Sequence, residues 1–140
     1  RRQVGLIYQF YNLIPVLDVE ENITLPINLD NRKVDKNYLD NLIKTLGLEK
    51  RRHHLPNELS GGQQQRTSIG RALITNPTII LADEPTGNLD SKSSDEIVEL
   101  LRKSNKEYKQ TIIMITHNME IAKCADRIIE IEDGKIIREV

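Results

Sequence analysis

Apolar positions along the chain switch between short continuous runs and helical spacing, which predicts alternating strands and helices. A strand is predicted over 4–8, a strand covered on both faces over 78–82, and another buried strand over 111–116. From about residue 18 to residue 57 the chain is polar, and within it apolar residues recur at helical spacing over 38–46. The sequence therefore predicts an α/β fold with a helical insertion.

Capping residues and helix breakers set the ends of the predicted helices. Asp35 is a suitable N-cap for the helix over 38–46, and Gly47 stands where its C-terminal cap is expected. A second helix starts at Ser60 and runs to about Ile74, where Asn76-Pro77 stops it. The remaining predicted elements are a helix over 91–108, a short helix over 119–123, and a hairpin over 127–137 with Asp133-Gly134 as its two-residue turn.

Length and composition restrict the functional classes. The 140 residues are sufficient for one compact domain, and 20 basic against 21 acidic residues give a net charge of −1. Neither this balance nor the 4% of aromatic residues favours nucleic acid as a partner. Cys124 is the single cysteine, so it forms no internal disulfide; it suits a reducing compartment and is expected to be a small packed residue. No apolar run approaches the roughly 18 residues that span a bilayer.

Polar side chains gather at the carboxyl ends of the three predicted strands. Gln9 follows the first strand, Asp83 and Glu84 end the second, and Thr116 and His117 end the third. Most strands simply end where polar loops begin, so each residue alone carries little information. In an open α/β sheet, however, ligands bind beyond the carboxyl ends of the strands, and an amide, two carboxylates and an imidazole at one edge favour a functional site.

The adjacent carboxylates Asp83 and Glu84 are costly at the end of a buried strand, because like charges repel and lose hydration there. Magnesium bridging phosphates would offset that cost at Asp83, and Glu84 would then orient an attacking water or accept its proton. The alternative for Glu84 is that it caps a turn, since Pro85 follows it. In this setting, His117 could bind a terminal phosphate and the catalytic carboxylate, whereas a lone histidine is more often a loop residue.

The helix start Ser60-Gly61-Gly62-Gln63 has two interpretations. Serine followed three residues later by glutamine fits a capping box, which by itself stabilises a helix start. Paired glycines are unfavourable in a helix, but they let an anion approach the positive helix end closely. We therefore predict that this segment binds phosphate. Asp90 has a similar alternative, because it could serve only as the N-cap of the helix over 91–108.

Taken in order, these motifs resemble those of an ATP-binding cassette (ABC) nucleotide-binding domain. The matching segments are Tyr8-Gln9-Phe10 for the Q-loop, 59–63 for the signature, 79–84 for Walker B, 87–90 for the D-loop, and Thr116-His117 for the switch histidine. The whole chain is similar to the C-terminal two-thirds of such a domain. The resemblance implies part of a P-loop NTPase (RecA-like) core, divided into a strand and Q-loop (1–12), a helical subdomain (13–59), and the signature helix with the remaining α/β core (60–140).

The resemblance also implies roles for the residues in these motifs. Asp83 and Gln9 would serve Mg²⁺, Glu84 the attacking water, His117 the γ-phosphate of ATP, and Asp90 the dimer contact. Ser60, Gly61, Gly62 and Gln63 would bind nucleotide held by a second ATPase subunit, most simply in a homodimer. Gln9 and the helical subdomain would couple ATP hydrolysis to a membrane permease, which places the protein at the cytoplasmic face of the membrane.

The residues within the motifs indicate one branch of the family. The segments 59–66 and 82–90 resemble ATPases that export peptides, lipoproteins and macrolides, and Thr67-Ser68-Ile69-Gly70 resembles ATPases of antimicrobial-peptide resistance. The expected activity is therefore ATP hydrolysis that powers export or extrusion of such a substrate.

One family motif has no counterpart in the sequence: Gly-x-x-x-x-Gly-Lys-Ser/Thr, the Walker A loop that cradles phosphates, does not occur. We therefore expect an N-terminally truncated chain, inactive alone, with exposed apolar surface and a tendency to self-associate. Two other interpretations are a DNA-repair or chromosome-organising ATPase, which the short interval between Gln9 and Ser60 disfavours, and a non-catalytic module that lends its signature motif to a partner.

Overall fold

The computed structural model describes residues 4–140 and contains a three-stranded parallel sheet and a separate hairpin. The sheet has the order β1-β2-β3, with β1 (Val4–Ile7), β2 (Ile79–Asp83) and β3 (Thr111–Ile115). The helices are α1 (Val19–Leu29), α2 (Lys36–Thr45), α3 (Gly61–Leu73), α4 (Ser91–Tyr108) and α5 (Met119–Ala122), and two 3₁₀ turns lie at Glu49–Arg51 and Pro56–Glu58. The first three residues of the predicted segment 1–12 lie outside the described residues.

Side-chain caps start three of the helices where the sequence predicts them. Asp35 accepts hydrogen bonds from the backbone N–H groups of Asn37 and Tyr38 at the start of α2. Ser60 and Asp90 cap α3 and α4 in the same way, each satisfying a backbone N–H that a helix start leaves unpaired. Gly47, just beyond α2, has a φ of +68°, which glycine adopts without strain. These helix ends are confirmed.

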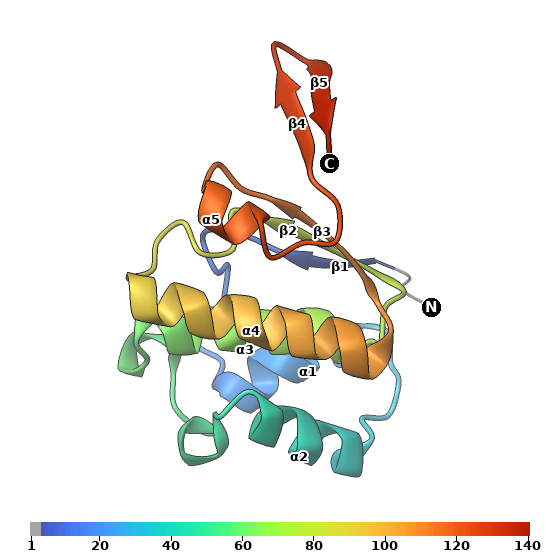
Figure 1. The fold of residues 1–140 in the computed structure, drawn as a ribbon. Coiled ribbons are helices and arrows are strands. Elements are labelled where there is room, and N and C mark those ends of the chain that lie inside the picture. Colours follow the sequence, from blue (N-terminus) through green and yellow to red (C-terminus); the bar gives the residue numbers. More distant parts are fainter. Residues whose placement is uncertain (1–3) are drawn as a thin grey trace.

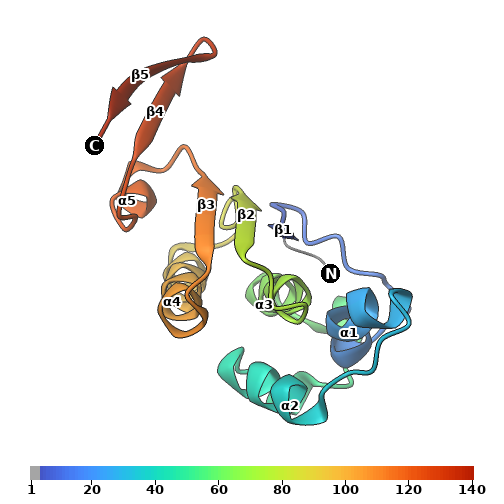
Figure 2. The ribbon, with the colours of Figure 1, turned by 90° about the vertical axis from the view of Figure 1, so that its right-hand side faces the viewer.

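Helices α1–α4 lie on one side of the sheet, and their apolar faces form the core together with that side (Figures 1 and 2). Because side chains alternate along a strand, Ile7, Ile80 and Ala82 point toward the helices and are buried. Gly5 lets β1 approach α3 closely, since a Cβ there would lie 2.9 Å from the carbonyl oxygen of Ala72. This close approach fixes β1 relative to the C-terminal end of α3.

The opposite face of the sheet is open, which corrects the prediction of strands covered on both sides. The exposed fractions of Leu81, Ile113 and Ile115 are 39%, 52% and 60%. The strands pair as predicted, but among residues 4–140 the packed helices α1–α4 cover only the other face. An apolar run alone does not tell how many faces of a strand are covered.

The hairpin of β4 (Ile129–Glu132) and β5 (Lys135–Glu139) projects away from the sheet (Figure 1). Asp133 and Gly134 have φ values of +49° and +73°, which is the backbone geometry of the predicted two-residue turn. Apolar side chains of the hairpin, such as Ile131, are exposed, and Cys124 is exposed rather than packed as expected. The chain therefore carries exposed apolar surface on the sheet and on the hairpin; self-association stays a prediction.

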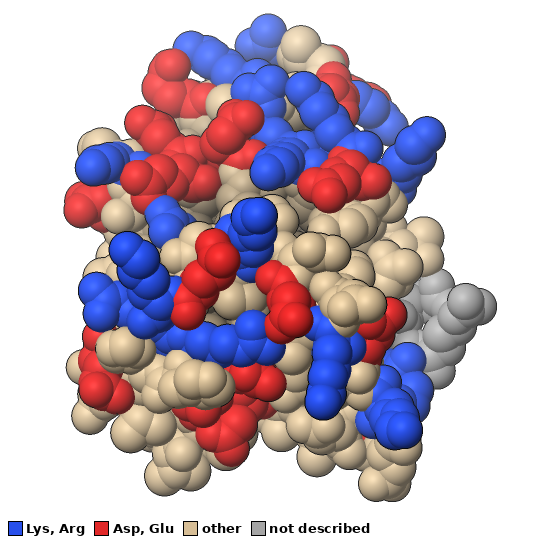
Figure 3. All heavy atoms as spheres, turned by 90° about the horizontal axis from the view of Figure 1, so that it is seen from below, with Lys and Arg blue, Asp and Glu red and all other residues tan. Residues whose placement is uncertain are grey.

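Two further features are the distribution of charge on the surface and the character of the helices. On the face seen from below in Figure 1, basic and acidic side chains are intermixed (Figure 3). No helix within residues 4–140 has both the length and the apolar character that crossing a membrane requires.

Candidate functional site

The carboxyl ends of β2 and β3 bring Glu84 and His117 into direct contact. Nδ1 of His117 lies 2.6 Å from Oε1 of Glu84, and the backbone N–H of His117 donates to the same oxygen at 3.1 Å. The Glu84 side chain is 20% exposed, whereas that of His117 is 85% exposed. The carboxylate is therefore held in place by one neighbour, and the imidazole can reach a ligand at the sheet edge.

Glu84 has a backbone conformation that is unusual for glutamate. Its φ is +47°, in the left-handed region, although it precedes Pro85 and residues before proline favour extended backbone. Its N–H donates to the carbonyl of Ile115 and its carbonyl accepts from the N–H of Gly87, so it begins a tight turn. Backbone hydrogen bonds close this turn, while the carboxylate accepts from the backbone N–H of His117 and faces its ring, so a capping role stays an alternative for Glu84. Such local strain is frequent at functional sites.

Gln9 lies against the turn that follows Glu84. Its Nε2 donates to Oδ1 of Asn88 at 3.4 Å, and Nδ2 of Asn88 donates to the backbone carbonyl of Gln9 at 3.2 Å. A Cβ at Gly87 would lie 2.6 Å from Nε2 of Gln9, so only glycine fits there without a shift of Gln9. Because its amide nitrogen faces Asn88, Gln9 has its amide oxygen to offer to a cation.

Asp83 lies at the end of β2 and is exposed, so the cost of a buried charge that the sequence suggested does not apply to it. Within residues 4–140, no three His, Cys, Asp or Glu side chains are grouped so that they could hold a metal. Magnesium commonly takes only one or two protein carboxylates, with phosphates and waters as its other ligands. The oxygen donors of Asp83 and Gln9 therefore fit Mg²⁺ that arrives with a nucleotide.

The start of α3 contains the capping box that the sequence allowed. Oγ of Ser60 accepts from the N–H of Gln63 at 3.2 Å, and Oε1 of Gln63 accepts from the N–H of Ser60 at 3.0 Å. Both bonds use side-chain oxygens as acceptors. The hydroxyl hydrogen of Ser60 and the NH₂ group of Gln63 remain as donors, so capping and anion binding are compatible.

The two glycines of this segment have packing roles that the sequence did not indicate. A Cβ at Gly61 would lie 3.1 Å from the hydroxyl oxygen of Tyr11, and one at Gly62 would lie 3.2 Å from Oγ of Ser93. Each is closer than an ordinary van der Waals contact. Close packing against Tyr11 and Ser93 therefore favours glycine at both positions, whether or not an anion binds.

Asp90 serves as the N-cap of α4. Its Oδ1 accepts a hydrogen bond of 2.7 Å from the N–H of Ser93, and this bond holds the pKa of Asp90 below its usual value. Asp90 precedes helix α4, which packs on α3. The capping alternative is thus present in the structure, and a dimer contact stays a prediction.

Gln65 and Arg71 are two residues of the site region to which sequence reasoning assigned no role. The side chain of Gln65 is fully buried, and its Nε2 donates to the backbone carbonyls of Tyr8 and Pro85. Arg71 donates to the carbonyls of Tyr11 and Asn12 at 2.9 and 2.6 Å. The signal for Gln65 was a polar residue one turn before the apolar Ile69, on the same helix face.

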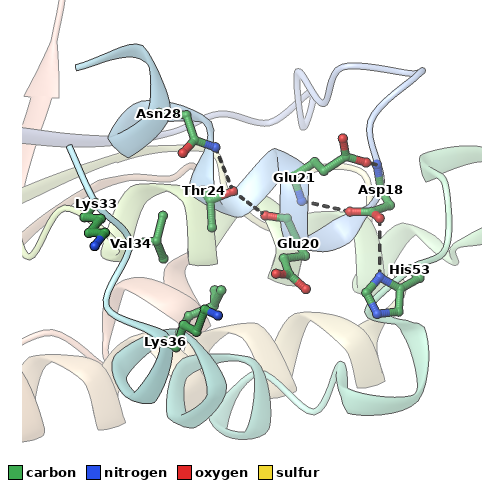
Figure 4. A pocket seen from close by; sticks show the side chains of 10 residues that line it. Asp18, Glu20, Glu21, Thr24, Asn28, Lys33, Val34, Lys36 and His53 are labelled. Atoms are coloured by element: carbon green, nitrogen blue, oxygen red, sulfur yellow. Dashed lines mark hydrogen bonds and ion pairs between the residues drawn. The ribbon is translucent and has the colours of Figure 1, made fainter. Parts of the chain in front are cut away.

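A surface hollow lies away from the strand ends. It has a volume of about 730 Å³ and lies beside α1 and α2, where Figure 4 shows His53 against Asp18 and a chain of hydrogen bonds through Thr24. A second hollow of about 410 Å³ lies between α4 and α5. Neither is lined by Glu84 or His117.

Comparisons with known proteins find a matching family, similar sequences and similar solved structures. A scan against models of protein families matches residues 1–87 to ABC transporter. MJ0796, an uncharacterized ABC transporter ATP-binding protein of Methanocaldococcus jannaschii, is 45% identical over 146 residues, which cover 99% of this chain and 62% of MJ0796. The dimeric structure of the MJ0796 cassette in a post-hydrolysis state, bound to ADP and Pi, matches with a TM-score of 0.84 and 41% identity, over 99% of this chain and 62% of that one.

Two further relatives carry names that include a transported class. The macrolide export ATP-binding/permease protein MacB of Escherichia coli is 48% identical over 141 residues, which cover 99% of this chain and 22% of MacB. The lipoprotein-releasing system ATP-binding protein LolD of Cytophaga hutchinsonii is 43% identical over 138 residues, which cover 97% of this chain and 63% of LolD.

The chain belongs to the ABC transporter family, and its fold is that of an ABC ATP-binding cassette. It spans about three-fifths of the length of MJ0796 and of LolD. The predicted family and fold class are thereby confirmed; the roles of the individual site residues stay predictions.

Proposed function

We propose that the intact protein is the ATP-binding subunit of an ABC transporter, which hydrolyses ATP at a head-to-tail dimer interface to power export or extrusion of a peptide, lipoprotein or drug-like substrate. The observation that carries this proposal is the contact between Glu84 and His117, with Glu84 in a left-handed conformation at the carboxyl end of β2. A carboxylate and an imidazole fixed at an open sheet edge suit phosphoryl transfer to water.

Each side chain at the strand ends has a separate task in this proposal. Glu84 orients the attacking water or accepts its proton. His117 fixes the carboxylate through Nδ1 and, with both ring nitrogens protonated, donates to the γ-phosphate through Nε2. The amide oxygen of Gln9 and the carboxylate of Asp83 would hold Mg²⁺, which would offset the negative charge of the phosphates. All four tasks use groups at the same edge of the sheet.

The start of α3 supplies donors to the nucleotide of the second subunit. Ser60 and Gln63 present their O–H and NH₂ groups at the positive end of a helix of 13 residues, where an anion is stabilised. Gly61 and Gly62 have no side chains that would hinder an anion at this helix end. Asp90 lies near the same end and contributes to the dimer contact. The dimeric form of the related MJ0796 cassette supports this pairing.

The membrane partner is a permease, bound through Gln9 and the helical subdomain of residues 13–59, so that the protein works at the cytoplasmic face of the membrane. The lack of a membrane-spanning helix within residues 4–140 agrees with a peripheral subunit. MacB and LolD, named for macrolide export and lipoprotein release, support the substrate classes.

The experiment is to measure Mg-ATP binding and hydrolysis by the 140-residue chain and by the full-length natural protein, with Glu84→Gln as the control. The full-length protein should hydrolyse ATP and lose turnover on Glu84→Gln, whereas the 140-residue chain should not bind, because its sequence contains no Walker A loop. Turnover by the 140-residue chain would show that another segment cradles the phosphates.

A non-catalytic module that lends its signature motif to a partner ATPase is the second candidate, since the 140 residues hold a signature motif without a Walker A loop. A full-length protein that fails to hydrolyse ATP alone but raises the turnover of a partner ATPase would favour this candidate.

A further inference from the structure

We propose that Gln65 is a positioning residue that couples the start of α3 to the groups at the ends of β1 and β2. This inference rests on the proposed function. In a head-to-tail dimer, Ser60 would serve the nucleotide of the neighbouring subunit while Glu84 serves the subunit's own nucleotide. Gln65 would then link two different nucleotide sites through one side chain.

The contacts of Gln65 join three segments that are distant in sequence. From the middle of α3, its Nε2 donates to the carbonyl of Tyr8, which precedes Gln9, and to the carbonyl of Pro85, which follows Glu84. The distance to the Tyr8 oxygen is 3.1 Å, and the side chain has no exposed surface. A shift of α3 would therefore displace both the backbone after β1 and the backbone after β2.

Glutamine at this position has both a benefit and a cost for folding. Its nitrogen pairs the carbonyls of Tyr8 and Pro85, but its Oε1 is buried and has no hydrogen-bond partner within residues 4–140. An apolar side chain of similar length would remove this unpaired oxygen and would leave the two carbonyls without the Gln65 donor. The amide is explained if the two bonds from its nitrogen serve to position Tyr8-Gln9 and Glu84-Pro85.

Gln65 differs from its neighbours because it reaches the turn after β2 beside Glu84. Arg71 holds the carbonyls of Tyr11 and Asn12, so α3 and the segment after β1 already form one unit. The link from Gln9 to the turn after β2 runs through Asn88, three residues beyond Pro85. Gln65 contacts that turn directly next to Glu84, where a small displacement matters most for the attacking water.

The test compares Gln65→Met with Gln64→Met in the full-length protein. Gln64 is the matched control, because it is the adjacent glutamine and, within residues 4–140, its Nε2 donates to the carbonyl of Leu59 in its own helix start. In the folded Gln65→Met protein we expect kcat to fall about tenfold or more while KM for ATP stays within about twofold; Gln64→Met should change neither by more than about twofold. A merely structural role would lower the melting temperature and leave the kcat of folded protein unchanged.

Hydrogen exchange supplies a readout that does not depend on ATP hydrolysis. Amides of residues 84–90 should exchange about tenfold faster in Gln65→Met than in Gln64→Met, because the turn loses its bond to α3. Unchanged exchange, or a kcat of Gln65→Met within about twofold of wild type, would overturn the proposal. A wild-type protein without ATP turnover would instead reject the proposed function, and the exchange result would still decide whether Gln65 holds the turn.

If Gln65→Met does not fold, Gln65→Glu replaces it, since glutamate keeps the length and loses both N–H donors. Its activity relative to wild type should rise as the pH falls, because a protonated carboxyl can donate one hydrogen bond again. A ratio that does not change with pH would contradict the role of these donors.

Discussion

The start of α3 and the ends of β2 and β3 carry the predicted site residues in different ways. At the start of α3, Ser60 and Gln63 cap the helix, so they stabilise the fold whether or not a ligand binds. At the strand ends, Glu84 adopts a left-handed backbone and His117 projects into solvent. The first region combines a structural role with a predicted ligand-binding role, whereas the second is held in a conformation that costs free energy.

This difference separates two kinds of sequence motif. A motif that also caps a helix would be retained by the fold alone, so its presence is weak evidence for function. The left-handed backbone of Glu84 costs free energy, and the hydrogen bonds of its carboxylate go to His117, an exposed residue; this pair is therefore the stronger evidence. Variants that remove the proposed chemical role of a residue but keep its structural role, or the reverse, test this difference.

The largest effect is expected for Glu84→Gln in the full-length protein. The amide keeps the size of the side chain but cannot accept a proton, so kcat for ATP should fall by about 10² to 10⁴, the usual contribution of a general base. Steady-state hydrolysis with a binding measurement checks this, and ATP affinity should be retained. Turnover within about threefold of wild type would remove Glu84 from the chemistry.

The next effect is expected for Gln63→Glu. Glutamate at this position still completes the capping box with Ser60, but it replaces the NH₂ donor by a negative charge. Stability should stay within about 0.5 kcal/mol of wild type, while ATP-dependent dimer formation weakens about tenfold or more. Light scattering or sedimentation with and without ATP checks the dimer. Unchanged dimer formation would leave Gln63 with capping alone.

A smaller effect is expected for the stability of Ser60 variants. Ser60→Ala removes the N-cap of α3 and should lower the free energy of unfolding by about 1 kcal/mol, whereas Ser60→Asp keeps a capping oxygen and should be close to wild type. Urea unfolding of the full-length protein measures both. Equal stability of the alanine and aspartate variants would show that the cap contributes nothing.

The smallest effect is expected for Asp90 in acid. The hydrogen bond from Ser93 lowers the pKa of Asp90 in the folded protein, so its stabilising contribution is present above the ordinary carboxyl pKa and is lost as the pH falls through the folded value. Asp90→Asn still caps the helix but does not titrate. The stability difference between wild type and this variant should therefore change in favour of the variant as the pH falls, and a constant difference would contradict the assignment.

Local signals in the sequence were sufficient for most of the fold. Asp35, Ser60 and Asp90 cap the helices that they were predicted to start, and Asp133-Gly134 makes the predicted turn. Each depends on hydrogen bonds or backbone preferences within a few residues. The open face of the sheet was not predicted, because coverage of Leu81 depends on which other elements pack there.

The candidate site was predicted in composition more than in geometry. The parallel order of the strands brings Glu84 to His117, as their positions after apolar runs suggested. The left-handed φ of Glu84 was not predictable, because the following Pro85 favours the opposite. The hydrogen bonds from Gln65 to Tyr8 and Pro85 were also not predicted, since their acceptors are backbone carbonyls distant in sequence.

The most direct test of the contrast between the two regions is the free energy of unfolding of Glu84→Gly, with Lys109→Gly as its control. Both residues have left-handed backbone, with φ of +47° and +52°, but Lys109 lies at the end of α4, away from the strand-end groups. If Glu84 is retained for chemistry, both variants should gain a similar stability, about 0.5–1 kcal/mol. A Glu84→Gly protein less stable than Lys109→Gly by more than about 1 kcal/mol would show instead that Glu84 and His117 support the fold.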